Sequence, residues 1–386
     1  MPRKRRILFA KLGRFSYTND EVINQLIRNF PEHDLVVADV KDLAKQSYFS
    51  SFFNLLSEFA LFGPSVFRNR GELHAFFFRT PFMFRRLNRL LVERYGALAP
   101  ELDFVLQTQG LFNARLPGVP LMIYTDYTCL NNLDFAEYDR RYLRSEKYLR
   151  YEAELYRHAE AIAASGSHVE RVLVGQYGCD PARVRTVHIG ANVDAQQVST
   201  DLARYAAKHV LFVGVEWERK GGPALLEGFR QVFRDHPDAR LTVVGCSPDI
   251  SGPGITVVGA VPRAQMPPFY HAASVFCMPS LIEPLGIAAV EASLFRLPVI
   301  ATQIDGFLET VTDQETGILV PVNDSAAIAS ALRRLFDDPA LARRMGLAGH
   351  GRNATRFNWN EVGGRLRDLA TTIVPCLRQA ASPAFP

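Results

Sequence analysis

The sequence has few cysteines, and their spacing indicates no pairing between them. Five occur among 386 residues, and no two form a C-x-x-C pair. Neither a disulfide framework nor a zinc site is therefore indicated. Cys277, inside the apolar run "SVFCMPS", is expected to be a small buried hydrophobe. This cysteine usage fits a reducing compartment, and we expect the protein to be cytoplasmic.

Long apolar runs are also missing. No stretch approaches the roughly 20 uninterrupted apolar residues that a membrane-spanning helix needs. The first residues, "MPRKRRILFAKLGRFS", are basic, but Lys11 and Arg14 cut the apolar run too short for a secretory signal. We expect this segment to form a first strand ending near Gly13, in a chain that is cytoplasmic or peripheral at the inner membrane surface.

Charge of one sign is not in large excess. The formal net charge is +4 and the isoelectric point is near 8.8. This balance is compatible with anionic small molecules or a membrane surface, but it is too small to imply nucleic acid. Hydrophobic residues make up 48% and charged residues 22%, which excludes disordered and fibrous classes. The length favours two domains over one.

Short apolar runs alternate with helical patterns, which predicts βαβ units and parallel sheets. We predict an N-terminal Rossmann-like domain over 1–200 and a C-terminal one over 205–356, with a polar linker within 191–209. Ligands of this architecture usually bind in a cleft between the domains. The expected strands are 7–11, 34–38, 103–107, 120–124, 161–165, 183–188, 210–215, 240–245, 255–259, 274–280, 297–302 and 317–322.

One segment of the N-terminal half departs from this alternation. Residues 47–95 are crowded with Phe and Arg, a mixture found on helices that lie against lipid headgroups. Alternatively, they form domain helices whose Phe residues fill the core and whose Arg residues face water. We therefore count peripheral membrane contact through 47–95 among the expected interactions, whereas nucleic acid is not expected as a partner.

A basic, glycine-rich loop follows the first predicted strand of the second half. In "VLFVGVEWERKGGPALLEGF" the strand ends at Gly214, and "RKGG" (219–222) precedes a helix opened by Pro223. Arg219 and Lys220 thus lie at a strand end and a helix N-terminus, where phosphate is favoured. A solvated basic turn is the alternative. The loop is not a Walker A motif, because G-x-x-x-x-G-K-[ST] is absent.

Two carboxylates occur in the segment "SLIEPLGIAAVEAS". Glu283 lies in a loop after a predicted buried strand, and Glu291 lies in the next helix, where side chains lean toward the N-terminus. The N–H groups of Leu285, Gly286 and Ile287 would face a phosphate oxygen there. Paired carboxylates would suit the vicinal hydroxyls of a sugar. The spacing alone carries no weight, since the chain repeats it at Glu93/Glu101, Glu146/Glu154 and Glu152/Glu160.

Each carboxylate also has a structural explanation. Glu283 could be a helix cap and Glu291 a surface charge. Glu291, however, stands between Val290 and Ala292 on a helix that is apolar nearly all round. A carboxylate in that position needs a partner.

Two residues of the N-terminal half are further candidates. Asp126, in "PLMIYTDYTCLNN", follows a strand end and could face the cleft, or it could initiate a turn beside Thr125 and Thr128. Gly13 could let the first loop approach a ligand closely, although an ordinary turn glycine explains it equally well. No strand-end D-x-D is present that would hold a metal with nucleotide phosphates.

Four ordered motifs make the C-terminal half similar to a known family. The chain resembles the family 4 retaining glycosyltransferases (glycosyl transferases group 1) of the GT-B fold, an α/β fold of two Rossmann-like doubly wound domains facing a central cleft. The resemblance covers nearly all of 205–365 and, more loosely, 165–194. It is carried by "RKGGPALLEGF", "SLIEPLGIAAVEA", "LPVIATQIDGFLETVTDQETGILVPVND" and "FNWNEVGGRL".

The resemblance implies a role for each matching residue. Glu283 matches the first Glu of the family's E-x7-E motif, which is placed by the donor sugar. Glu291 matches the second, which hydrogen-bonds the ribose of the nucleotide. Lys220 matches the lysine that grips the diphosphate. Gly286 and Ile287 match the backbone donors to its distal phosphate.

Three positions depart from the family pattern. Val215 stands where an Arg usually follows the strand glycine, and Arg219 could supply that second cation. Asp126 stands where the family commonly places a catalytic-site histidine. Arg296 replaces a small residue before the "LPV" strand, which alters the end of the helix rather than its chemistry.

The resemblance implies a retaining glycosyltransferase that moves a sugar from a nucleotide-diphosphate sugar to a hydroxyl acceptor, in glycan, exopolysaccharide or glycolipid synthesis. No cofactor or metal is expected, because the RKGG loop and a helix N-terminus can stabilise the leaving diphosphate. A C-terminal helix over 357–380 is expected to pack back on the N-domain. A catalytically silent nucleotide-sugar or glycan-binding protein is the alternative, while a sugar-nucleotide isomerase lacks an evident acid/base cluster.

Overall fold

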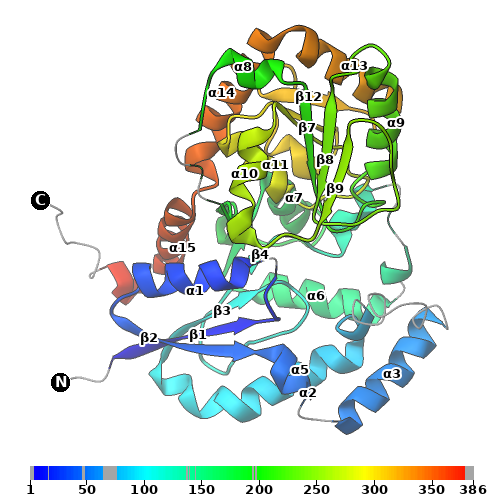
Figure 1. Cartoon of the computed structure of the whole chain (residues 1–386). Helices are drawn as coiled ribbons and strands as arrows, with labels where there is room; N and C mark the ends of the chain where they lie inside the picture. Colours follow the sequence, from blue (N-terminus) through cyan, green and yellow to red (C-terminus); the bar gives the residue numbers. More distant parts are fainter. Residues whose placement is uncertain are drawn as a thin grey trace, which may run out of the picture. The chain divides into compact units, whose positions relative to one another are not determined.

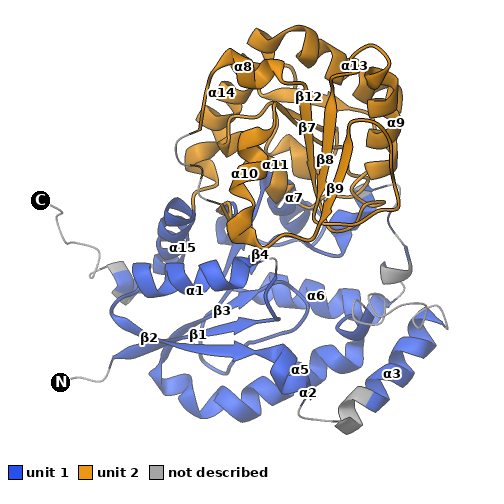
Figure 2. Cartoon of the chain, viewed as in Figure 1, with its two compact units in different colours: residues 1–189, 359–386 blue, residues 190–358 orange. Residues whose placement is uncertain are grey.

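The computed structural model consists of two compact α/β units (Figure 1). Figure 2 shows the first, residues 1–189 with 359–386, and the second, residues 190–358. The first unit gathers two separate parts of the chain, whereas the second is continuous. The structure describes residues 4–15, 17–45, 48–63, 76–135, 138, 140–143, 145–193, 195 and 198–378.

Six parallel strands form the sheet of the first unit, in the order β2-β1-β3-β4-β5-β6. The residues of β4 and β5 are all buried, which is why these strands read as continuous apolar runs. The chain order changes direction between β1 and β3, so the loops after these strands flank a topological switch point. The strands are β1 (Arg5–Lys11), β2 (His33–Asp39), β3 (Leu102–Thr108), β4 (Leu121–Thr125), β5 (Ala161–Ala164) and β6 (Val184–Thr186).

The helices of the first unit include one from the C-terminal part of the chain. Helix α15 (Trp359–Ile373) lies beside α1 (Thr18–Asn29) and β5 (Figure 1). A Cβ added at Gly363 would lie 2.3 Å from the Gln25 side chain, so the two helices approach closely. The remaining helices are α2 (Val40–Lys45), α3 (Tyr48–Phe62), α5 (Pro81–Tyr95), α6 (Glu146–His158) and α7 (Ser167–Gly175).

The sheet of the second unit has six parallel strands in the order β12-β11-β10-β7-β8-β9. Read from the other edge this is 3-2-1-4-5-6, the order of the doubly wound dinucleotide-binding fold. Its switch point lies between β7 and β10. The strands are β7 (His209–Val213), β8 (Arg240–Val244), β9 (Ile255–Gly259), β10 (Val275–Met278), β11 (Val299–Thr302) and β12 (Gly317–Val320).

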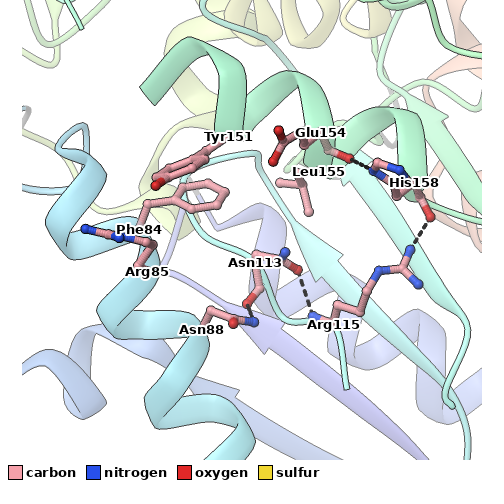
Figure 3. A pocket seen from close by; sticks show the side chains of 9 residues that line it. All are labelled: Phe84, Arg85, Asn88, Asn113, Arg115, Tyr151, Glu154, Leu155 and His158. Carbon is pink, nitrogen blue, oxygen red and sulfur yellow. Dashed lines mark hydrogen bonds between the residues drawn. The ribbon is translucent and has the colours of Figure 1, made fainter. Parts of the chain in front are cut away.

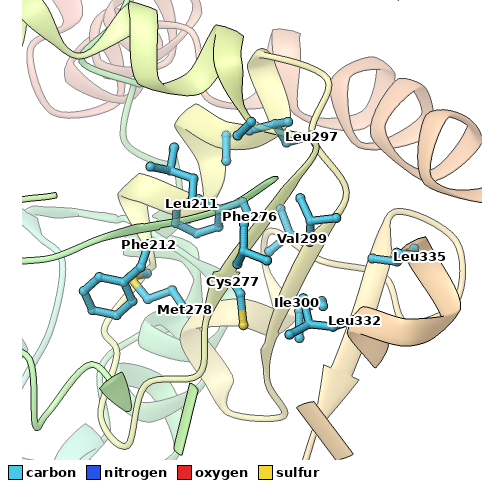
Figure 4. Packing of buried hydrophobic residues seen from close by; sticks show 14 of the residues in the cluster. Leu211, Phe212, Phe276, Cys277, Met278, Leu297, Val299, Ile300, Leu332 and Leu335 are labelled. Atoms are coloured by element: carbon cyan, nitrogen blue, oxygen red, sulfur yellow. The ribbon is translucent and has the colours of Figure 1, made fainter. Parts of the chain in front are cut away.

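The core of the second unit surrounds its two middle strands (Figure 4). Phe276, Cys277 and Met278 of β10 are fully buried, which confirms the expectation for Cys277. The helices around this sheet are α8 (Leu202–Ala206), α9 (Gly222–Phe233), α10 (Pro267–Ala272), α11 (Ile287–Leu294), α12 (Asp305–Leu308), α13 (Ser325–Asp337) and α14 (Pro339–Arg356).

One expectation differs from the structure. The predicted linker 191–209 contains α8, and Tyr205 of that helix is fully buried in the core of the second unit. A helix of less than two turns gives too short an apolar period to be recognised. The Phe- and Arg-rich segment 47–95 includes residues 64–75, which lie outside the described residues; the rest of it forms mainly α3 and α5.

None of the helices in the described ranges combines the length and the apolar composition that crossing a bilayer requires.

Candidate functional site

Two loops of the second unit meet at the switch point of its sheet. Residues 214–221 follow β7, and residues 279–286 follow β10. Leu281 N–H donates to the Arg219 carbonyl at 2.8 Å. Gly221 has φ +73°, and a Cβ there would lie 1.8 Å from the Pro279 carbonyl oxygen, so only glycine fits. The crevice at such strand ends is where ligands of this fold bind.

The first loop is anchored by an aromatic side chain. Trp217 packs edge-on against Phe212 with ring centroids 5.0 Å apart. Gly222 opens α9 directly beneath Trp217, because a Cβ would lie 2.1 Å from the indole ring. At the end of β7, a Cβ on Gly214 would come within 3.1 Å of Lys220 Cγ. The glycines therefore let the loop fold back so that Lys220 lies over the strand end.

Lys220 Nζ and Glu283 Oε2 form an ion pair that is largely withdrawn from solvent. The same oxygen accepts from Ser280 Oγ at 3.2 Å, and Oε1 accepts from Gly286 N–H at 3.0 Å. Burial acts to raise the pKa of Glu283, but Lys220, Arg219 and the Gly286 N–H outweigh it and hold the pKa below its usual value. Glu283 is therefore an ionised carboxylate held by a cation and a helix N-terminus.

Helix α11 presents its N-terminus to this pair. Its N-cap, Gly286, has φ +77°, and a Cβ there would lie 2.6 Å from the Phe307 ring. We expected three backbone N–H groups to be available here, but that of Gly286 donates to Glu283. The N–H groups of Leu285 and Ile287 have no hydrogen-bond partner among the described residues. Together with the helix dipole they favour an anion at this point.

Arg219 ties the two loops together. Its guanidinium donates to Glu216 Oε2 at 2.8 and 2.5 Å and to the Ile282 carbonyl at 2.7 Å. Its charge also lowers the pKa of Glu283. The side chain of Val215, where the family usually has an arginine, is 79% exposed. Arg219 therefore lies on the loop that carries Lys220, but its hydrogen bonds are made to protein groups.

Glu291 lies on the second turn of α11 and is 8% exposed. Tyr270 OH donates to its Oε2 at 2.8 Å, and Asn192 N–H donates to Oε1 at 3.2 Å. Burial raises its pKa, and Tyr270, Asn192 and Arg263 offset this rise only in part. The carboxylate thus has the partners that burial demands, and each oxygen keeps capacity for a second donor.

Arg296 lies just beyond the end of α11, which is the part of the helix where the family pattern is broken. It has φ +59°, and its guanidinium donates to the Val198 carbonyl at 2.9 Å. The substitution therefore concerns the end of the helix and not the two loops.

Gly13 and Asp126 belong to the first unit. Gly13 follows β1 with φ +57°; its N–H donates to Asp39 Oδ1 at 3.1 Å and its carbonyl accepts from Asn19 Nδ2 at 2.9 Å. Asp126 follows β4, and burial raises its pKa to about 7 although His168 opposes the shift. His168 is 2% exposed, and neither ring nitrogen has a partner in the described part of the chain.

Several residues around the predicted site were not expected from the sequence. Ser280 holds Glu283, and it could have been noticed because it directly follows the strand. Tyr270 and Asn192 hold Glu291 from positions 21 and 99 residues away. His168 lies 42 positions after Asp126 in the sequence. Contacts over such separations arise from the tertiary fold and have no local sequence signal.

A cavity of about 250 Å³ lies elsewhere in the first unit, between α5 and α6 (Figure 3). None of the predicted site residues lines it. Several of its polar groups bond to one another or to nearby backbone, as Arg115 does with the His158 carbonyl. Within the described residues no three His, Cys, Asp or Glu side chains gather as a metal ion would require. The cavity is lined by Phe84, Arg85, Asn88, Asn113, Arg115, Tyr151, Glu154, Leu155 and His158.

Solved structures share this architecture. Sucrose-phosphate synthase from Thermosynechococcus elongatus aligns with a TM-score of 0.68 and 20% identity, covering 96% of this chain and 100% of that one. HepE of Anabaena, in complex with UDP and glucose, aligns with a TM-score of 0.65 and 14% identity, covering 95% and 100%. Two parallel six-stranded sheets with flanking helices define the class: the chain has the GT-B fold.

Residues 207–338 match the family model described as Glycosyl transferases group 1. One relative is a D-inositol 3-phosphate glycosyltransferase of Streptomyces avermitilis, 30% identical over 57% of this chain and 53% of the relative. Another is a phosphatidyl-myo-inositol mannosyltransferase of Mycobacterium leprae, 33% identical over 48% and 52%. The chain spans about half the length of these relatives.

Proposed function

We propose that the chain is a glycosyltransferase that moves a sugar from a nucleotide-diphosphate sugar to a hydroxyl acceptor. The observation that carries this proposal is the Lys220–Glu283 ion pair at the N-terminus of α11, placed at the switch point of the second sheet. The cation and the free backbone N–H groups can bind the diphosphate of such a donor, and the buried carboxylate can bind its sugar.

The ion pair also suggests how the donor is received. In the free protein the Glu283 carboxylate is the anion that Lys220 and the Gly286 N–H bind. A diphosphate is also an anion. At the same place it could bind the unpartnered N–H groups of Leu285 and Ile287. We infer that Lys220 interacts with both the diphosphate and Glu283. The Glu283 oxygen that Lys220 then binds less tightly accepts hydrogen bonds from the sugar. Glu291 accepts from the ribose with its remaining lone pairs.

The chemistry needs stabilisation of the leaving group more than a nucleophile. The bond between the anomeric carbon and the diphosphate oxygen breaks, and its electron pair leaves with the diphosphate. The acceptor oxygen forms the new bond to the same carbon and gives up its proton to a base, the role that we propose for Asp126. Lys220 and the N-terminus of α11 stabilise the negative charge that develops. Attack on the face from which the nucleotide leaves, and hence retention, follows from the family 4 resemblance.

The role of Asp126 remains a prediction. It follows β4 in the first unit, and its raised pKa places its change of charge near neutral pH. A carboxyl with that property suits exchange of a proton with an acceptor hydroxyl. Replacing Asp126 by Asn is expected to lower turnover while leaving nucleotide affinity unchanged. An equal loss of nucleotide affinity would contradict this role.

The acceptor class is also part of the proposal. Both relatives named above carry an inositol compound in their names, so inositol phosphates and phosphatidylinositol belong in an acceptor panel. Glycan, exopolysaccharide or glycolipid synthesis in the cytoplasm is the setting that we propose. We also propose that no metal ion takes part, because Lys220 and α11 supply the positive charge.

One experiment separates catalysis from silent binding. The protein is incubated with UDP-, GDP- and ADP-sugars and the acceptor panel, with and without EDTA, and nucleotide release is followed. Release of one nucleotide, unaffected by EDTA, is the expected result. Binding without release across the panel would favour a catalytically silent nucleotide-sugar-binding protein. Strict dependence on Mn²⁺ would contradict the metal-independent mechanism.

A further inference from the structure

Helix α3 turns an apolar face away from its own unit. Four large side chains on it are each more than half exposed: Phe52 at 60%, Phe53 at 54%, Leu56 at 52% and Phe59 at 51%. Positions 52, 56 and 59 follow helical spacing and 53 lies beside them, so the four share one face. They form a contiguous apolar patch, which marks an interaction site more often than isolated exposed residues do.

The opposite face of α3 is buried, and it combines a polar pair with Phe62, which stacks on Phe76. Asn54 and Glu58 are both fully buried. Asn54 Nδ2 donates to Glu58 Oε1 at 2.8 Å and to the Phe77 carbonyl at 2.9 Å, and Asn54 Oδ1 accepts from Thr80 Oγ1. Thr80 is also the N-cap of α5. These hydrogen bonds fasten α3 by its polar face.

An ordinary surface helix buries its apolar stripe and exposes its polar side. Helix α3 instead buries a polar pair beside Phe62 and exposes four large apolar side chains. Turning α3 over would bury the four apolar side chains, but it would break the Asn54 hydrogen bonds and the stacking of Phe62 on Phe76. The structure instead keeps the polar pair inside. The contacts that hold α3 on its unit therefore also determine that its apolar face points outward.

The neighbouring helix adds positive charge. Helix α5 packs against α3 and carries Arg89 and Arg94 at exposed positions, with Glu93 as its one acidic residue. The described side chains of α3 include a single charged group, Glu58, which is buried. The two helices thus combine an exposed apolar face with exposed cationic side chains.

We propose that α3 docks the protein on a membrane surface with anionic lipid headgroups. The apolar face enters the boundary between headgroups and acyl chains, and the arginines of α5 contact the headgroups. This narrows the expectation for 47–95 to two described helices. It goes beyond the proposed transfer reaction and does not depend on it.

The size of the patch favours lipid over a protein partner. At the exposures given above, four such side chains offer on the order of 400 Å² of apolar surface. A standard protein interface takes roughly 800 Å² from each partner. A bilayer has no such requirement, because its affinity adds apolar insertion to electrostatic attraction.

The test is co-sedimentation of the intact protein with vesicles, in the absence of any sugar nucleotide. One set is pure phosphatidylcholine and the other is equal parts phosphatidylcholine and phosphatidylglycerol. Wild type is expected to bind the anionic set and to be released by salt. Phe52→Gln/Leu56→Gln should lower the partition coefficient at least about tenfold. Arg89→Gln/Arg94→Gln should weaken binding and flatten its salt dependence.

A matched control replaces apolar residues of similar exposure elsewhere. Ile27 is 60% and Leu202 is 50% exposed, so Ile27→Gln/Leu202→Gln removes comparable apolar surface from α1 and α8. It should bind vesicles as wild type does. Circular dichroism and thermal unfolding of every variant verify that the fold is retained.

Three results would overturn the proposal. Wild type does not bind anionic vesicles, or the α3 variant binds them as well as the control does. In the third result, wild type forms an oligomer but binds no vesicles, and the α3 variant does not form the oligomer. That result would assign the apolar face of α3 to contact with a second copy of the chain. Because no donor is present, each result is independent of whether the chain transfers sugar.

Discussion

Glu283 and Glu291 are both buried carboxylates, yet their surroundings shift their pKa values in opposite directions. Lys220 holds the pKa of Glu283 below its usual value, whereas burial beside a neutral hydroxyl raises that of Glu291. Glu283 is therefore permanently charged at neutral pH and suited to a site that also binds an anion through Lys220. Glu291 is suited to neutral donors such as the hydroxyls of a ribose.

Glu291→Gln tests that assignment. The substitution retains an acceptor for Tyr270 but removes the charge that strengthens hydrogen bonds from hydroxyls. We expect nucleotide affinity to fall by about tenfold in a calorimetric titration. Glu291→Ala should also lower the free energy of unfolding by about 1–3 kcal/mol, because the Tyr270 hydroxyl and the Asn192 N–H lose their acceptor.

Tyr270→Phe is the matched control, since it removes the structural hydrogen bond to Glu291 and leaves the carboxylate in place. It should reduce stability with little change in nucleotide affinity. If it lowered affinity as much as Glu291→Gln does, Glu291 would have only a structural role.

At the scale of elements, the N-terminus of α11 depends on one glycine. Gly286 has φ +77°, and a Cβ would lie 2.6 Å from the Phe307 ring. Gly286→Ala should therefore lower the free energy of unfolding by about 1–3 kcal/mol. Nucleotide binding should weaken as well, because the first turn of α11 shifts. Chemical denaturation and calorimetry measure the two effects.

Gly351→Ala provides the comparison for Gly286→Ala. Gly351 lies in α14, and a Cβ there meets nothing within 4 Å. Alanine in an open helical position should leave stability unchanged or raise it by about 0.5–1 kcal/mol. Equal effects of the two substitutions would contradict the close approach at Gly286.

Helix α3 carries a pH prediction. Burial raises the pKa of Glu58 to about 7, so the folded state holds this proton more tightly than the unfolded state. The free energy of unfolding is therefore highest below the usual glutamate pKa, and it falls as pH rises through about 7. Glu58→Gln should remove this fall. Urea midpoints at about pH 5 and pH 8 measure it.

Glu93→Gln on the exposed side of α5 is the control for Glu58. It should keep the pH dependence of wild type. A Glu58→Gln variant whose urea midpoint still falls with pH as in wild type would show that another group is responsible.

The elements that could be predicted from the sequence are those with strong local patterns. Each predicted strand segment overlaps an observed strand. Strands buried on both faces, such as β4 and β5, are continuous apolar runs, whereas β2 and β9 are only partly buried. The orientation of α3 could not be predicted in this way. Its apolar residues lie on both faces, and the contacts of Asn54 with residues 77 and 80 and of Phe62 with Phe76 decide which face is buried.

The arrangement of the candidate site was predictable to the extent that it is local. Lys220, Glu283 and Gly286 occur in two short motifs after strands, and the strand order brings those motifs together. The pairing of Glu283 with Lys220 in the free protein was not foreseen, nor was the use of the Gly286 N–H by that carboxylate. Both depend on side-chain geometry that spacing does not encode.

At the scale of the whole molecule, the family segment 207–338 lies entirely within the second unit. The first unit contributes Asp126, the cavity between α5 and α6, and the outward face of α3. The proposed donor chemistry therefore belongs to the second unit, and the acceptor and the membrane surface are questions about the first. Helix α15 belongs to the first unit although it follows the second in sequence.

The central claim is that Lys220 and the N-terminus of α11 bind a nucleoside diphosphate without a metal ion. Calorimetric titration of the intact protein with UDP, GDP and ADP in EDTA tests it most directly. Lys208→Ala is the control, because Lys208 pairs with exposed Asp238 outside the site. One nucleotide should bind wild type and Lys208→Ala alike, and Lys220→Ala should bind it roughly 10- to 100-fold more weakly. Equal binding by Lys220→Ala, or no binding of any nucleotide by wild type, would contradict the claim.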